Sequence, residues 1–219
     1  MKRVQQARAR VQAGFSLVEL LLSMSLGLLL SGLVLQALVG EGQNAQRFTR
    51  LLRERTHQRR ALGLIRSDLE RATAVVSPEE GPLPVICGLN GRTPVLQLVT
   101  PSAAGKATVT YSVGAPPSGI WEGRVLVRCG PAYELEGGVN SEATYQSRVV
   151  LDRLAPAATA WTACGDLPGG LVLNGSASLP FSACLDPASQ LVALRLEQSF
   201  PLSGGRLQRL ISEVVAGAG

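Results

Sequence analysis

The hydrophobic pattern begins with one long apolar run close to the N-terminus. From Phe15 to Val39 the chain runs through 25 residues with a single charged side chain, Glu19. At about 1.5 Å per residue, an α-helix of this length spans the hydrocarbon core of a bilayer with some tilt. We therefore predict a transmembrane helix over residues 15–39.

A second pattern follows, with the period of an amphipathic helix. Between residues 40 and 76 the chain becomes strongly charged, and apolar side chains recur at spacings of three and four residues. Such a stripe is one helix face that needs a sheet to cover it. We expect a helix over residues 40–76, with Ser77-Pro78 as its end and with Gly40 and Gly42 either as bending points or simply at the exit from the membrane. The stripe comprises Leu62, Ile65, Leu69, Ala72 and Val76.

Residues 77–219 change to short runs of β-prone residues separated by Gly, Pro and Asn. Apolar and polar residues alternate in several of them, as in half-buried antiparallel strands. A long helix on a mainly antiparallel sheet gives the α+β fold class, with residues 77–219 as one β-rich globular domain. The expected strands are Val85–Cys87, Val95–Thr100, Ala107–Val113, Ile120–Arg128, Arg148–Leu151, Leu191–Gln198 and Arg206–Val215.

Two segments of this domain, residues 131–144 and 155–187, are rich in Gly, Ala, Ser and Pro. They are too long for simple hairpin turns, so we expect either functional loops or poorly ordered insertions. The four cysteines lie beyond the apolar run and form no C-x-x-C motif, which favours disulfides over a zinc site in an exported domain. Three pairings are open, and sequence neighbours close the shortest loops: Cys87 with Cys129 and Cys164 with Cys184.

The first fourteen residues are basic and carry no acidic side chain. This flank is typical of the cytoplasmic side of a membrane helix. Four of the five net positive charges of the chain come from these residues, so their removal leaves about +1, and the bulk charge then indicates no nucleic-acid partner. An ionised Glu19 inside a membrane helix needs a partner, and a new amine at Phe15 is one hypothesis. The four basic residues are Lys2, Arg3, Arg8 and Arg10.

The segment Gly14-Phe15-Ser16-Leu17-Val18-Glu19-Leu20-Leu21 resembles the class III signal of type IV pilins and type II secretion pseudopilins. The resemblance implies that a prepilin peptidase cuts between Gly14 and Phe15 and methylates the new N-terminus. It also implies that Glu19 guides assembly with other subunits. Residues 1–14 would then be a cleaved leader. The protein would reside in the bacterial inner membrane, with its C-terminal domain in the periplasm, before it enters a pilus or pseudopilus.

A weaker resemblance covers residues 120–200. Arg128-Cys129-Gly130-Pro131, followed by a Gly-rich loop and a β run that ends near Phe200, is similar to W-class minor pilins and J-type pseudopilins. The resemblance implies a minor pilin that joins or primes a type IV pilus. The alternatives are a pseudopilin of a type II secretion system and a signal-anchored periplasmic binding or adhesion module.

The candidate catalytic and ligand-binding residues of the sequence do not change this interpretation. His57 is the single histidine, it lies in a basic helical stretch, and the sequence has no G-x-S-x-G or phosphate-binding G-x-x-x-x-G-K-[ST] motif. We expect no enzyme activity, cofactor or metal. For the arginines between residues 53 and 60 we prefer a solvated helix face, with anionic lipid or an acidic filament neighbour as the alternatives.

Overall fold

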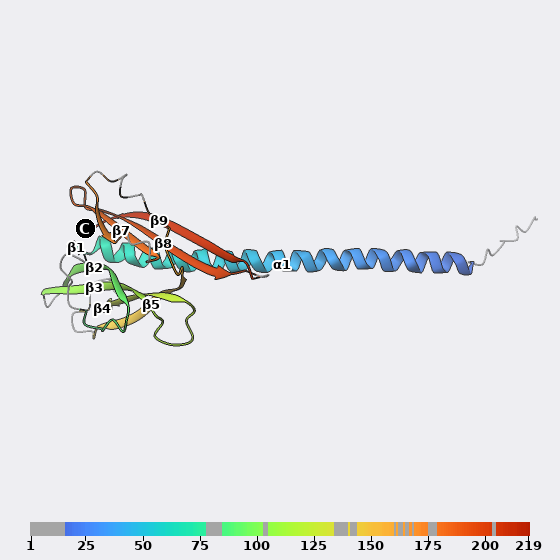
Figure 1. The fold of residues 1–219 in the computed structure, drawn as a ribbon, viewed down its shortest axis with the longest axis horizontal. Coiled ribbons are helices and arrows are strands. Elements are labelled where there is room, and N and C mark those ends of the chain that lie inside the picture. Colours follow the sequence, from blue (N-terminus) through green and yellow to red (C-terminus); the bar gives the residue numbers. More distant parts are fainter. Residues whose placement is uncertain are drawn as a thin grey trace, which may run out of the picture. The chain divides into compact units, whose positions relative to one another are not determined.

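The computed structural model describes residues 16–77, 85–102, 105–133, 140, 144–159, 161, 164, 167, 169–174, 179–202 and 205–219. The chain divides into two compact units, residues 1–48 and residues 49–219, and each is described by itself. The first contains the N-terminal part of helix α1 (Leu17–Glu70), and the second contains the rest of α1 and all the strands (Figure 1). The expected α+β fold class, with a long helix and a mainly antiparallel sheet, is confirmed.

Helix α1 remains helical through Gly40 and Gly42 but ends at Glu70, six residues before the predicted end. Residues Ala74–Val76, which we expected to be helical, form strand β1 and pair with Gln97–Val99 of β2. The error has a local cause, because Thr73, Val75 and Val76 are β-branched and favour extended backbone. The periodicity of the apolar side chains continued past the point where the helix stops.

Two groups of antiparallel strands form the globular unit. In the first group, β1, β2 (Thr93–Ser102), β3 (Gly105–Gly114), β4 (Arg124–Gly130) and β5 (Gln146–Leu154) are neighbours in chain order. In the second, β8 (Leu191–Pro201) lies between β7 (Phe181–Asp186) and β9 (Leu207–Gly217), and β6 (Leu171–Asn174) pairs with β7. The groups meet where Leu154 of β5 pairs with Gln198 of β8.

Several predicted boundaries in this unit are wrong. Strands β6 and β7 lie within residues 155–187, which we expected to be loop. Every residue of β7 is buried, so tertiary packing holds this segment in the sheet despite its weak pattern of Ser, Ala and Cys. Residues 85–87 form a turn rather than a strand, with Ile86 exposed, and β4 begins at Arg124 rather than Ile120. The remaining expected strands are present as β2, β3, β5, β8 and β9.

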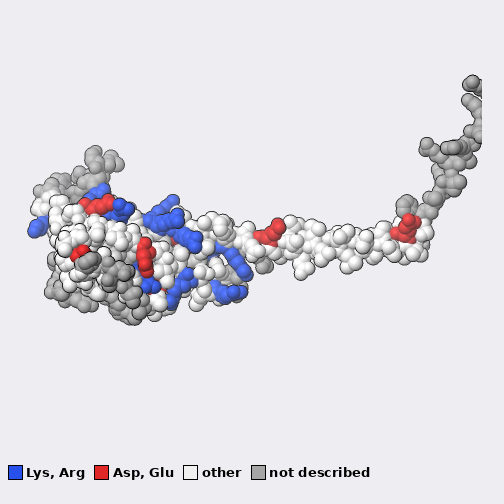
Figure 2. Space-filling model, turned by 90° about the horizontal axis from the view of Figure 1, so that it is seen from above, with Lys and Arg blue, Asp and Glu red and all other residues white. Residues whose placement is uncertain are grey.

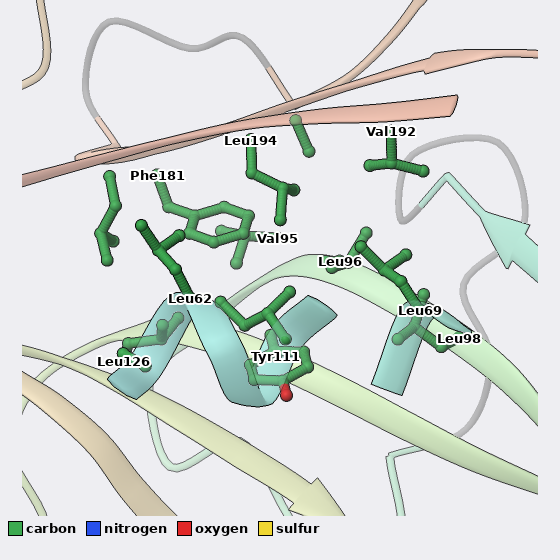
Figure 3. Close-up of a cluster of buried hydrophobic side chains, with 14 of the residues drawn as sticks. Leu62, Leu69, Val95, Leu96, Leu98, Tyr111, Leu126, Phe181, Val192 and Leu194 are labelled. Carbon is green, nitrogen blue, oxygen red and sulfur yellow. The ribbon is translucent and has the colours of Figure 1, made fainter. Parts of the chain in front are cut away.

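The core lies between the two strand groups and is built around the C-terminal part of α1. Leu62 and Leu69 of the helix contact this core, with Phe181 and Leu194 of the β7–β8 group on one side and Tyr111 of β3 on the other (Figure 3). The predicted apolar stripe is buried at Leu62, Ile65, Leu69 and Ala72. Its fifth member, Val76, belongs to β1 and is half-buried.

Candidate functional site

The start of α1 carries a helix cap and one carboxylate. The hydroxyl oxygen of Ser16 accepts a hydrogen bond from the backbone N–H of Glu19 at 3.2 Å, which satisfies one of the unpaired donors of the first turn. Ser16 and Glu19 have the spacing of a capping box, and a carboxylate in the first turn interacts favourably with the helix dipole. Gly14 and Phe15 lie outside the described residues, so their processing roles stay predictions.

The part of α1 between Leu17 and Val39 exposes its apolar side chains on all sides. Leu17 is 76% exposed and Leu30 is 56% exposed, and no residue in the most apolar 18-residue window is buried. Figure 2 shows this stretch without Lys or Arg, and Glu19 and Glu41 are the charged residues between positions 16 and 46. Burying one such leucine contributes roughly 1.5–3 kcal/mol, so this surface favours lipid or other apolar helices over water.

Length and composition agree with a membrane role for this segment. The 18-residue window has a mean hydropathy of 2.1, and α1 is long and apolar enough to cross a membrane. A comparison with family models then identifies the same stretch: residues 9–35 match the prokaryotic N-terminal methylation motif. The chain carries a class III signal.

This signal is consistent with the type IV pilin and pseudopilin family. The match includes Gly14, Phe15 and Glu19 and extends through most of the predicted transmembrane segment. Together, the class III signal and the apolar helix indicate membrane anchoring. No curated protein and no solved structure matches the chain.

In the globular unit, polar side chains fix the C-terminal part of α1 between the strands. The guanidinium of Arg128, on β4, donates to both carboxylate oxygens of Asp68, at 2.8 and 3.2 Å, and the Tyr111 hydroxyl donates to the same carboxylate. Asp68 and Tyr111 are fully buried. Burial and the adjacent Asp68 carboxylate raise the pKa of Tyr111 well above its usual value. Burial acts to lower the pKa of Arg128, but Asp68 outweighs it and raises that pKa.

Two further residues of α1, Gln58 and Glu54, hold the helix about three and four turns before Asp68. Glu54, 1% exposed, accepts from Arg153 of β5 at 2.6 Å, and Arg153 also donates to Glu122. The Gln58 amide donates to the Leu196 carbonyl oxygen at 3.0 Å and accepts from Ser212 at 2.7 Å. We call Glu54, Gln58 and Asp68, with their partners, the helix clamp. Because its partners come from both strand groups, the clamp ties this part of α1 to the whole globular unit.

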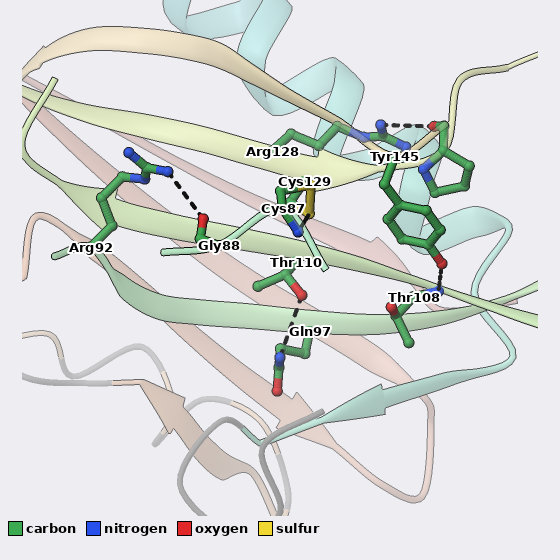
Figure 4. Close-up of a disulfide and its surroundings, with 10 residues drawn as sticks. Cys87, Gly88, Arg92, Gln97, Thr108, Thr110, Arg128, Cys129 and Tyr145 are labelled. Atoms are coloured by element: carbon green, nitrogen blue, oxygen red, sulfur yellow. Dashed lines mark hydrogen bonds between the residues drawn. A yellow bond between two sulfur atoms is a disulfide. The ribbon is translucent and has the colours of Figure 1, made fainter. Parts of the chain in front are cut away.

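Both disulfides join sequence neighbours. Cys87 is bonded to Cys129 and Cys164 to Cys184, with Cα–Cα distances of 5.9 and 5.7 Å. The first ties the turn at residues 85–88 to β4, close to the hydrogen bond between Arg128 and the Pro131 carbonyl oxygen (Figure 4). The second ties residue 164 to the buried strand β7. Both therefore attach irregular segments to the sheet.

The helix clamp was missed at the sequence level, although the sequence contains a signal for it. Glu54, Gln58 and Asp68 fall at the three- and four-residue spacing of the apolar stripe, so they belong to the buried face of the helix. Polar residues on such a face need buried partners. Among the described residues, no group of three His, Cys, Asp or Glu side chains is placed to hold a metal ion.

Proposed function

We propose that this protein is a minor pilin-like structural subunit. In this proposal a prepilin peptidase cuts it after Gly14 and methylates Phe15, and the apolar part of α1 then moves from the inner membrane into a type IV pilus or its priming complex. The observation that carries the proposal is the class III signal on a helix whose apolar side chains are exposed on every side. No residue of the subunit performs catalysis, and its partners are other pilin subunits.

The surface of the exposed helix supports close packing against neighbouring helices. Ser23, Gly27 and Ser31 recur at intervals of four, so they lie along one face, and nothing within 4 Å would meet a Cβ added at Gly27. Small residues at this spacing let helix backbones approach closely in an apolar environment. Neighbouring subunits would thus replace lipid around the helix during assembly.

The helix clamp supports a mechanical role. A force applied along the N-terminal part of α1 passes to its C-terminal part, where Glu54, Gln58 and Asp68 bind both strand groups. A subunit held in a filament by its helix needs such an attachment so that its globular unit stays folded under load. The alternative is a pseudopilin of a type II secretion system, because type IV pilins and pseudopilins both carry the class III signal.

The experiment compares Glu19, which lies in the apolar segment, with Glu41, which follows that segment. In Glu19→Ala we expect the subunit to remain in the membrane and to be lost from isolated filaments. In the matched control Glu41→Ala we expect normal incorporation, because Glu41 lies outside the matched motif. Immunoblots of the filament and membrane fractions measure both. If the Glu19→Ala variant entered filaments as efficiently as the wild type, the assembly role of Glu19 would be contradicted. If the wild-type subunit were recovered solely from a periplasmic pseudopilus, the pseudopilin alternative would be correct.

A further inference from the structure

A groove lies between α1 and strand β5 of the globular unit. It consists of two adjoining cavities of about 660 and 220 Å³, which share Arg60, Val149 and Val150 in their linings. Tyr133 lines the larger cavity and Trp121 the smaller one. We call this feature the α1–β5 groove. Its length along β5, from Gln146 to Asp152, suits an extended segment better than a compact ligand.

The β5 side of the groove is an open sheet edge. One edge of β5 pairs with β4 along its whole length, from Gln146 to Leu154. Among the described residues, the other edge pairs with β8 only at Leu154. Near that point the Gln198 side-chain amide donates a hydrogen bond to the Asp152 carbonyl oxygen. Within the described part of the chain, no strand covers the edge from Gln146 to Leu151. Such an edge presents backbone donors and acceptors that a strand of another chain can pair with.

The groove also carries a positive charge. Arg60 and Arg148 are both exposed and lie on opposite walls, and neither forms an ion pair with any described residue. Arg128 is neutralised by Asp68, and the carboxylate of Asp152 at one end offsets part of the charge. Since neither guanidinium group has an ion-pair partner among the described residues, the two favour an occupant with carboxylate side chains.

The aromatic residue Tyr133 lines the other end of the groove. The guanidinium groups of Arg71 and Arg128 lie 4.7 and 5.0 Å from the centre of the Tyr133 ring. The Tyr133 hydroxyl is buried but has no hydrogen-bond partner among the described residues.

We propose that the α1–β5 groove binds an extended acidic peptide segment of a partner protein, which adds as a strand to the open edge of β5. Backbone hydrogen bonds to β5 hold the segment, and Arg60 and Arg148 select its carboxylate side chains. The groove lies wholly within the globular unit, so this interaction does not rest on assembly through the N-terminal helix.

The test uses the full-length protein in phosphatidylcholine nanodiscs and a fluorescent ten-residue peptide of alternating Glu and Thr. Fluorescence anisotropy measures binding, and hydrogen exchange measures protection of the β5 backbone. We expect saturable binding that weakens with salt, with slower exchange of the amides of residues 146–151. A matched peptide of alternating Lys and Thr is expected not to bind.

Two neighbouring arginines provide the matched variants. Arg60 lines the α1–β5 groove, whereas Arg59 lines a different depression beside β9. We expect Arg60→Glu and Arg148→Glu each to weaken peptide binding by at least about tenfold. Arg59→Glu should leave it within about twofold of wild type, as expected for a charge outside the interface.

Several results would overturn the proposal. These are an absence of peptide binding, equal loss in Arg59→Glu and Arg60→Glu, or binding that leaves the β5 amides unprotected. Displacement of the peptide by phosphatidylglycerol vesicles, with loss of β5 protection, would assign the groove to anionic lipid instead. Protection of the β5 amides by the peptide is measured on the wild-type protein, so this test does not depend on whether a variant folds.

Discussion

The two parts of α1 share one secondary structure but have opposite surroundings. Leu30, in the N-terminal part, is 56% exposed, whereas Leu69, near the C-terminal end, is fully buried between the strand groups. The N-terminal part has no charged side chain between Glu19 and Glu41, yet the buried part carries Glu54, Gln58 and Asp68 on its core face. The apolar surface of the first part is therefore available to other molecules, and the polar contacts of the second hold the globular unit together.

The largest expected effect on stability comes from breaking the helix clamp at Asp68. Asp68→Ala removes the carboxylate and leaves Arg128, 5% exposed, as a buried charge without its ion-pair partner. Loss of one member of a buried pair costs about 3–5 kcal/mol of the free energy of unfolding. Urea unfolding of the detergent-solubilised protein, followed by tryptophan fluorescence, measures this change.

The matched control is Glu70→Ala, two residues away on the same helix. Glu70 pairs with Arg66 in an exposed i,i+4 ion pair, which contributes at most about 0.5 kcal/mol. Similar free energies of unfolding for Asp68→Ala and Glu70→Ala would contradict the role given to the helix clamp.

A pair of leucine substitutions tests the contrast between the two parts of the helix directly. Leu69→Ala should destabilise the globular unit by about 2–5 kcal/mol because it opens a cavity in a fully buried position. Leu30→Ala should change the unfolding of that unit by less than about 0.5 kcal/mol, as surface substitutions usually do. The same denaturation assay compares them, and a large effect of Leu30→Ala would show that the N-terminal part supports the folded domain.

Alkaline pH should weaken the clamp through Tyr111. Because burial and Asp68 raise the pKa of Tyr111 in the folded state, folding favours the protonated phenol. This contribution to stability is fully present below the unfolded pKa of about 10 and is lost as the pH rises above it. Unfolding measured between pH 8 and 11 should show a steeper loss for wild type than for Tyr111→Phe, which lacks the ionisable group. Parallel curves for the two proteins would contradict this account.

The smallest expected difference separates the two disulfides. Their sequence separations are 42 and 20 residues, and doubling a closed loop adds only about 0.6 kcal/mol in the chain-entropy model. We expect Cys87→Ser/Cys129→Ser to be the less stable of the two double variants by about that amount, with each losing several kcal/mol. Urea midpoints rank them, and the opposite order would show that local packing around β7 outweighs loop length.

The sequence predicted those features that depend on local periodicity and on linear motifs. Each of these features depends on residues that are close together in the sequence. They are the apolar run, the class III signal around Gly14 and Glu19, and the buried stripe at Leu62, Ile65 and Leu69. Strand β7 escaped detection because its burial results from β6 and β8 on either side. Contacts such as Asp68 with Arg128, sixty residues apart, depend on how the strands come together, so spacing along the chain does not reveal them.

The α1–β5 groove was unpredictable for the same reason. Arg60 and Arg148 are far apart in sequence, and the open edge of β5 exists because β8 pairs with β5 near Leu154 and then follows β7 and β9. The basic stretch around Arg60 was expected to be a solvated helix face, whereas the groove gives this arginine a place in a proposed binding surface.

The central claim is that the apolar part of α1 is retained after processing and drives assembly. N-terminal sequencing and intact mass measurement of the protein purified from the cell envelope test it most directly. We predict a chain that begins with N-methylated Phe15 and lacks residues 1–14. A mature protein that still begins at Met1, or one that has lost the apolar segment together with the leader, would contradict the account.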